Sequence, residues 1–359
     1  MTTTKSYDYL NRLTQISSVP SASVAVNYNC TYNTANQRTK NTLVDGSYWI
    51  YNYDALGQVT GGTKSFADGT LVPGQQFGYQ FDDIGNRKQT TAGGDSVGAS
   101  LRLASYSVNS LNQITNRYYP GTNDVVGVAL ATNTVTVNGQ TAWRKGEYFW
   151  ALVKSNNTAA AQWEGIKVVS GGNTNNGNLF VPKTQEQFGY DADGNLTNDG
   201  HWVYTWDAEN RLTAMTNYTG VGPQYQLTFA YDAKGRRIQK VVAVSGVALS
   251  TNNFLYDGWN LIAILNPQSS IIESFMWGTD LSGSLQGAGG VGGLLEVSCG
   301  TTNCFPAFDG NGNVMALVNA ADGTVAANDE YAAFGESARV TGVMPRNNPF
   351  RSRNPFQTV

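Results

Sequence analysis

One short formula recurs along this chain and constrains its fold more than any other feature. Its clearest double copy runs from Phe188 to Thr213. The formula is aromatic, any residue, aromatic, Asp, two free positions, Gly or Asn, a polar residue, an apolar residue and Thr. Asp favours the first position of a type I turn, and Gly or Asn at the fourth can adopt the left-handed conformation that closes a hairpin with a one-residue bulge. The formula therefore predicts a β-hairpin.

Copies of the turn occur in most of the chain. Each pairs an Asp with a Gly or Asn three positions later: Asp8 and Asn11, Asp54 and Gly57, Asp82 and Gly85, Asp191 and Gly194, Asp207 and Asn210, Asp232 and Gly235, Asp257 and Asn260, and Asp309 and Gly312. A degenerate copy has Asn109 and Asn112 at these positions. Each Asp carboxylate is expected to accept a hydrogen bond from the backbone N–H two residues on. The unequal steps between copies fit hairpins of differing length wound around an axis better than a strict solenoid.

A second aromatic often precedes the first by two positions, so that both face the same side of a strand. These residues are Tyr51, Tyr79, Phe188, Tyr204, Phe229 and Phe254. The stripe predicts a buried hydrophobic face, with a platform for stacking sugars as the alternative.

The repeats divide the chain into segments. Residues 1–122 and 183–282 are predicted as hairpins, and 123–182 as a β-rich insertion in which Asn138-Gly139 is a candidate type I′ turn. Residues 283–293 are so rich in glycine that they predict either a flexible crossing or a place where backbones approach closely.

The composition favours an all-β, turn-rich protein, because only 14% of the 359 residues are charged while Gly (40) and Tyr (19) are abundant. A net charge of -3 gives no basic surface for nucleic acid. The sequence contains no run of about 18 apolar residues, so no membrane span is predicted. The first residues lack the apolar segment of a secretory signal, and the chain could be a piece of a longer precursor. Cys299 and Cys304 could form a small disulfide after export, and Cys30 would then remain a free thiol.

The sequence offers little for catalysis or for cofactor binding. The single histidine, His201, has no second imidazole and no cysteine cluster to form a metal site, and no Gly-x-Ser-x-Gly motif accompanies it. The glycine run lacks the Lys-Ser/Thr of a phosphate-binding loop. Acidic residues outside the turns show no pairing: Glu147, Glu164, Glu186, Asp193, Glu209, Glu273, Glu296 and Glu330. We therefore predict no cofactor, no metal and no enzyme, with a polysaccharide-acting hydrolase or lyase as a lesser alternative.

The units Tyr190-Asp-Ala-Asp-Gly-Asn-Leu-Thr and Tyr204-Thr-Trp-Asp-Ala-Glu-Asn-Arg-Leu resemble the YD repeats of the Rhs family, which also resemble the shell of teneurins. The resemblance implies a spiralling β-hairpin shell around a cavity, which in bacterial relatives houses a variable C-terminal toxin. Residues 256–263 and 277–295 resemble the segment leading into the family's associated core, so 283–359 is predicted as the start of that core. After Asn348-Pro-Phe-Arg the family's Gly-Arg-Trp and Asp-Pro-x-Gly segments do not follow. Toxin activity and self-cleavage are therefore not carried over.

The predicted function is a structural, non-enzymatic shell segment that encloses or presents cargo, secreted or at the cell surface as part of a larger system. An extracellular glycan-binding or adhesion module is the alternative. Open strand edges invite pairing, so the expected partners are a second copy or other shell segments, a polypeptide cargo, or glycans. Neither nucleic acid nor a membrane span is expected.

Overall fold

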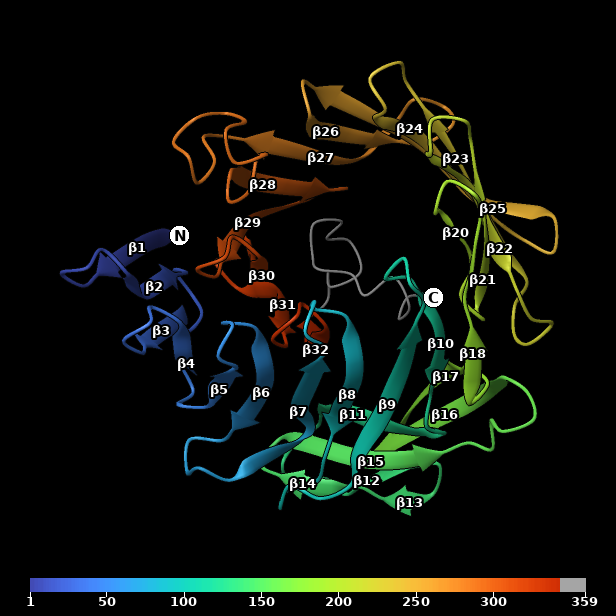
Figure 1. The fold of residues 1–359 in the computed structure, drawn as a ribbon. Helices are drawn as coiled ribbons and strands as arrows, with labels where there is room; N and C mark the ends of the chain where they lie inside the picture. Colours follow the sequence, from blue (N-terminus) through green and yellow to red (C-terminus); the bar gives the residue numbers. More distant parts are fainter. Residues whose placement is uncertain (343–359) are drawn as a thin grey trace. The chain divides into compact units, whose positions relative to one another are not determined.

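The computed structural model describes residues 1–342, and their regular elements are strands joined into antiparallel hairpins (Figure 1). This confirms the predicted all-β fold class. Predictions that rest on Asn348–Val359 lie outside the described residues. In the part that is described, no helix has the length and apolar character needed to cross a membrane. The chain divides into two compact units, unit 1 (Met1–Leu71 and Asn252–Val359) and unit 2 (Val72–Thr251).

Unit 1 is built from strands at both ends of the sequence, each paired with the next along the chain. Its first strands are β1 (Thr2–Tyr7), β2 (Leu13–Val19), β3 (Val26–Tyr32), β4 (Arg38–Leu43), β5 (Tyr48–Tyr53) and β6 (Val59–Ser65). Its later strands are β25 (Val247–Asp257), which begins in unit 2, β26 (Asn260–Leu265), β27 (Ile271–Trp277), β28 (Leu294–Cys299), β29 (Thr302–Phe308), β30 (Val314–Asn319), β31 (Val325–Tyr331) and β32 (Ser337–Gly342).

The first and last described hairpins of unit 1 share a hydrophobic core, and Figure 1 shows the blue strands next to the red ones. Ile16 and Tyr28 from β2 and β3 pack with Met315, Ala316 and Tyr331 from β30 and β31. A second core lies within the later strands and includes Phe275, Val297 and Leu317. Residues about 300 positions apart in sequence are thus packed together by apolar burial, the main stabilising term in folding.

Unit 2 contains hairpin strands and two small sheets. Its strands are β7 (Leu71–Phe81), β8 (Arg87–Gly93), β9 (Leu101–Val108), β10 (Ile114–Tyr118), β18 (Gln185–Gln187), β19 (Gly189–Tyr190), β20 (Leu196–Asn198), β21 (Trp202–Trp206), β22 (Leu212–Asn217), β23 (Tyr225–Tyr231) and β24 (Arg237–Val244). The small sheets are β11 (Thr122–Val128), β15 (Tyr148–Lys154) and β14 (Trp143–Lys145), and then β13 (Gln140–Thr141), β12 (Val135–Val137), β16 (Gln162–Ser170) and β17 (Asn173–Val181). They enclose a core of their own around Val135 and Phe149. The segment boundaries drawn from the repeats stay a prediction.

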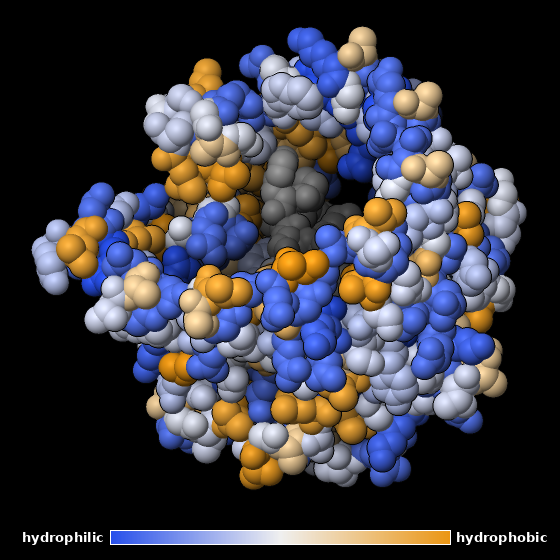
Figure 2. All heavy atoms as spheres, in the orientation of Figure 1, coloured by the Kyte–Doolittle hydropathy of each residue, from blue (hydrophilic) through white to orange (hydrophobic). Residues whose placement is uncertain are grey.

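The turns also carry exposed apolar residues at their second free position. Leu56, two residues after Asp54, is 74% exposed, and Ile84 and Leu111 occupy the same place in their own turns. Figure 2 shows apolar side chains in orange dispersed among polar ones on the visible face. Single exposed apolar residues are common on protein surfaces, so the formula tolerates them wherever the turn points outward.

The glycine-rich run packs closely against its neighbours, and hydrogen bonds to the Asp280 carboxylate fix its conformation. The Oδ1 atom of Asp280 accepts hydrogen bonds from the backbone N–H and hydroxyl of Ser282 (2.9 and 2.5 Å), and Oδ2 accepts from the N–H of Ala288 (2.6 Å) and Gly290 (3.1 Å). Hydrogen bonds led by the Ser282 hydroxyl lower the pKa of Asp280 to about 2. Gly290 has a φ of 80°, and a Cβ there would lie 2.9 Å from the side-chain oxygen of Asn260. Of the two alternatives for this run, the structure favours close packing over a flexible crossing.

Candidate functional site

The predicted turn residues share one hydrogen-bonded arrangement. At Asp191, Oδ1 accepts from the backbone N–H of Asp193 (3.0 Å) and of Asn195 (2.8 Å). The N–H of Gly194 donates to the Asp191 carbonyl (3.2 Å), and Gly194 is left-handed with φ of 86°. The same pattern occurs at Asp8, Asp54, Asp82, Asp207, Asp232 and Asp309, with Asn11, Gly57, Gly85, Asn210, Gly235 and Gly312 left-handed. One carboxylate oxygen in each copy is therefore engaged in shaping the turn.

The other carboxylate oxygen explains the polar position of the formula. Arg211 Nε donates to Oδ2 of Asp207 at 2.8 Å, and Nδ2 of Asn313 donates to Oδ2 of Asp309 at 2.9 Å. Hydrogen bonds from the backbone and side chain of Arg211 hold the pKa of Asp207 below its usual value. A residue that can donate from its side chain is thus needed directly after the Gly or Asn.

In several hairpins the aromatic residue directly before the turn links its hairpin to an earlier one. The Tyr231 hydroxyl donates to the carbonyl of Leu212 at 2.7 Å, and the Tyr331 hydroxyl donates to that of Val314 at 2.9 Å. Trp206 uses its indole N–H in the same way on the Leu196 carbonyl (2.7 Å). The acceptor is each time the apolar residue of the preceding copy. The rings therefore bring a directed hydrogen bond besides their apolar surface, which the sequence reasoning missed.

The structure differs from the prediction at Asp257. Asp257 and Asn260 form the last pair of the β25–β26 hairpin, so the loop is the two residues Gly258 and Trp259. Gly258 takes the positive φ (58°) instead of Asn260. A Gly at the first loop position favours a type II′ two-residue turn, and this glycine closes the hairpin before the longer turn can form.

Three further turns of the same kind were missed because no aromatic-Asp pair marks them. They begin at Asn33, Asp95 and Asn266 and place Asn36, Gly98 and Ser269 at positive φ. Asn offers the same side-chain oxygen as Asp in such turns. A search for Asp or Asn followed three positions later by Asn, Gly or Ser would have found them.

The remaining predicted residues do not gather into a reactive centre. Cys299 lies opposite Thr302 and Cys304 opposite Val297 in the β28–β29 ladder, and their disulfide stays a prediction. His201 stacks on Phe180, with ring centroids 3.8 Å apart, and burial lowers its pKa. Within residues 1–342, no three His, Cys, Asp or Glu side chains are grouped as a metal would require.

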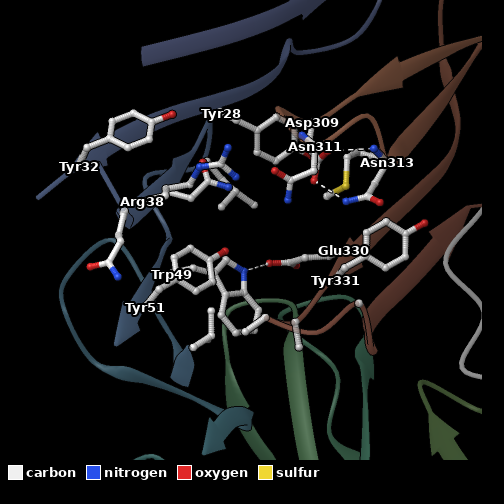
Figure 3. Close-up of a pocket in the computed structure, with 18 of the residues that line it drawn as sticks. Tyr28, Tyr32, Arg38, Trp49, Tyr51, Asp309, Asn311, Asn313, Glu330 and Tyr331 are labelled. Atoms are coloured by element: carbon white, nitrogen blue, oxygen red, sulfur yellow. Dashed lines mark hydrogen bonds between the residues drawn. The ribbon is translucent and has the colours of Figure 1, made fainter. Parts of the chain in front are cut away.

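A concave site lies in unit 1, between β3–β5 and the later strands β29–β31 (Figure 3). It is a cleft of about 430 Å³ whose walls carry Tyr28, Tyr32, Arg38, Asn41, Trp49, Tyr51, Tyr53, Asp309, Asn311, Asn313 and Glu330. We call it the unit 1 cleft. Its volume lies in the range of small-molecule sites, and aromatic and polar side chains share its walls.

A buried charge cluster surrounds Glu330, one of the residues that line the unit 1 cleft. Lys64 Nζ lies 2.5 Å from Oε1 of Glu330, and the indole N–H of Trp49 donates to the same oxygen at 2.7 Å. Arg339 Nε lies 3.3 Å from Oε2. Burial opposes ionisation of Glu330, but the charges of Lys64 and Arg339 outweigh it and hold its pKa below the usual value. The cluster thus links β5 and β6 to β31 and β32 by a paired, ionised carboxylate.

Comparison with known proteins gives partial sequence matches. No family model matches the chain. It is 30% identical over 164 residues to the tRNA3(Ser)-specific nuclease WapA of Bacillus spizizenii, a match that spans 45% of this chain and 6% of that protein. It is 29% identical over 164 residues, with the same shares, to the tRNA nuclease WapA of Bacillus subtilis strain 168. The tRNA(Glu)-specific nuclease WapA of Bacillus subtilis subsp. natto is 37% identical over 103 residues, which are 28% of this chain and 4% of that protein.

The solved structures that are similar give weaker information. The crystal structure of TcdB2-TccC3-Cdc42 aligns with 98% of this chain and 17% of its own, at 13% identity and a TM-score of 0.38. The crystal structure of TcdB2-TccC3 gives 12% identity and a TM-score of 0.38, with 98% of this chain and 18% of that chain covered. These values are too low to establish a shared fold.

The sequence matches correct one prediction. The curated proteins that share sequence with this chain are named for tRNA cleavage, which overturns the prediction of a non-enzymatic protein. That prediction rested on the turn-forming role of the repeated Asp residues. A structural role for these residues does not exclude catalysis elsewhere in a longer protein. The matched segments span only a small part of the curated relatives.

Proposed function

We propose that this chain is a β-hairpin shell segment of a larger RNA-cleaving toxin of the Rhs/YD-repeat kind. The observation that carries the proposal is the sequence shared with WapA proteins named as tRNA nucleases, over up to 164 residues. The repeated turn and the aromatic link between successive hairpins support a role in enclosing or presenting the part that cleaves RNA. In this role the protein acts outside the producing cell or at its surface.

The experiment is to raise antibodies against this chain, capture the native product from its source organism and incubate it with total tRNA. We expect the captured product to cleave tRNA at defined positions. The cleaving activity should elute together with this product from a sizing column. Capture with pre-immune serum is the control. A captured product that leaves every tRNA intact would contradict the proposal.

The edge of β1 supports a proposed partner. β1 lies at the end of its sheet order, and all its residues are exposed. An unpaired edge is a template for another strand, so we propose that it pairs with a second copy or with a neighbouring shell segment. Light scattering after size-exclusion chromatography of the purified chain should give a dimer or larger species. A monomer at all concentrations would exclude pairing with a second copy.

A further inference from the structure

The unit 1 cleft holds a cation without a carboxylate partner. Arg38, the first residue of β4, lines the cleft, and its Nε is buried without a hydrogen-bond acceptor. Among residues 1–342, no carboxylate lies within ion-pair distance of Arg38. An arginine keeps its charge at every physiological pH. The guanidinium is therefore available to an anionic ligand.

The acidic groups that line the cleft are already engaged. Asp309 accepts from the N–H groups of Asn311 (2.8 Å) and Asn313 (2.9 Å), and its second oxygen accepts from the Asn313 amide. Glu330 is occupied by Lys64, Arg339 and Trp49, as described above. Burial opposes the charge of Arg38 and the charge of Asp309 helps to raise its pKa, but Asp309 makes no ion-pair contact with it. The guanidinium lies close to Gly310, where an added Cβ would be 3.0 Å from Nη2.

The rest of the wall is suited to a flat, polar body. Trp49 and Tyr51 stand two positions apart on β5, and their rings are stacked with an interplanar angle of 7° and centroids 6.4 Å apart. Burial raises the pKa of Tyr51, so that its hydroxyl stays protonated and can donate a hydrogen bond. Side-chain amides of Asn36, Asn41 and Asn311 line the same cleft. Because Trp49 is only 2% exposed, the ring surface left for a ligand is that of Tyr51, which together with the amides suits a hydroxylated ring.

We infer that the unit 1 cleft binds an acidic monosaccharide unit, whose carboxylate pairs with Arg38 while its ring lies along the Tyr51 wall. Arg and carboxylate can form two parallel hydrogen bonds, which adds geometric selectivity to the charge attraction. The amides then serve the ring hydroxyls. This site goes beyond the proposed shell function and does not depend on it.

The test is isothermal titration of the purified chain with sodium glucuronate, with glucose as the uncharged analogue. We expect glucuronate to bind and glucose to bind at least tenfold more weakly. Arg38→Gln should raise the Kd for glucuronate at least tenfold. Arg237→Gln, an exposed strand arginine that does not line the cleft, is the matched control and should leave the Kd unchanged. No binding, or equal binding by wild type and Arg38→Gln, would overturn the inference.

Two further measurements keep the outcome clear. If Arg38→Gln fails to fold, Asn311→Asp places a new carboxylate on the cleft wall at an exposed turn position, where it should compete with the ligand for Arg38 and raise the Kd at least tenfold. An unchanged Kd in that variant would count against Arg38. N-acetyl-aspartate amide provides the same carboxylate on a peptide body. If it binds more tightly than glucuronate, the assignment to an acidic sugar is wrong.

Discussion

Replacing Glu330 with Gln tests whether the buried charge cluster around it stabilises the protein. The change keeps the size of the side chain and leaves an oxygen that can accept from Trp49, but it removes the charge that faces Lys64 at 2.5 Å and Arg339 at 3.3 Å. The side chains of Lys64 and Glu330 are both 4% exposed, so water cannot replace the missing anion. Removing one partner of a buried ion pair costs about 3 to 5 kcal/mol. Because the hydrogen bond from Trp49 can persist, we expect a loss at the lower end, about 3 kcal/mol.

Urea denaturation followed by tryptophan fluorescence measures this loss as a change in the free energy of unfolding. Asp83→Asn is the matched control, since it also replaces a carboxylate by its amide but at an exposed position that carries no hydrogen bond or ion pair from its side chain. It should change the free energy by less than about 0.5 kcal/mol. Adding Lys64→Met to Glu330→Gln should recover part of the loss, because the unpaired cation is then gone. The reasoning is refuted if Glu330→Gln unfolds within about 1 kcal/mol of wild type.

Three other outcomes follow from the turns and their links. Gly194→Val should lower the free energy of unfolding by about 1 to 2 kcal/mol, because Gly194 has φ of 86° and a β-branched residue is strained there; unchanged melting would contradict this. Tyr231→Phe removes the hydrogen bond to the Leu212 carbonyl and should cost about 1 kcal/mol, whereas Tyr9→Phe, at a position 92% exposed, should cost nothing measurable. In the folded protein the pKa of Glu330 lies below the ordinary 4.5 of Glu, and the pKa values of Asp191 and Asp207 lie below the ordinary 3.8 of Asp. The stabilisation from these carboxylates is therefore complete above about pH 4.5 and is lost as the pH falls through their folded pKa values. Melting temperatures measured from pH 6 down to about pH 2 should therefore fall below about pH 4.5, and a flat profile would count against these shifts.

The turns could be predicted from sequence because everything that forms them is local. Asp191 and Gly194 lie within one turn, and their roles follow from side-chain reach and left-handed backbone. The prediction went wrong at Asp257, where Gly258 comes immediately after the Asp and closes a shorter loop. It also missed Asn33, since the search required an aromatic residue before an Asp.

The cluster at Glu330 could not be predicted because its members are distant in sequence. Lys64 and Glu330 are separated by 266 positions, and no spacing rule connects them. Glu330 was grouped with the acidic residues that have no visible partner, although its burial on β31 beside Lys64 and Arg339 determines its role. Arg38 was missed for the same reason, since a cation is unpaired only when the folded neighbours are known. The proposed link to RNA cleavage rests on sequence shared with WapA proteins and not on any local chemistry.

Amide hydrogen exchange at the turns is the most direct test of the structural role of the repeated carboxylates. In Asp191→Ala, the amides of Asp193 and Asn195 lose the Oδ1 acceptor. Their exchange should become faster than in wild type, while the amides of Glu209 and Arg211, which donate to Asp207, should exchange as before. Equal exchange at Asp193 and Asn195 in the two proteins would mean that the carboxylate does not hold the turn.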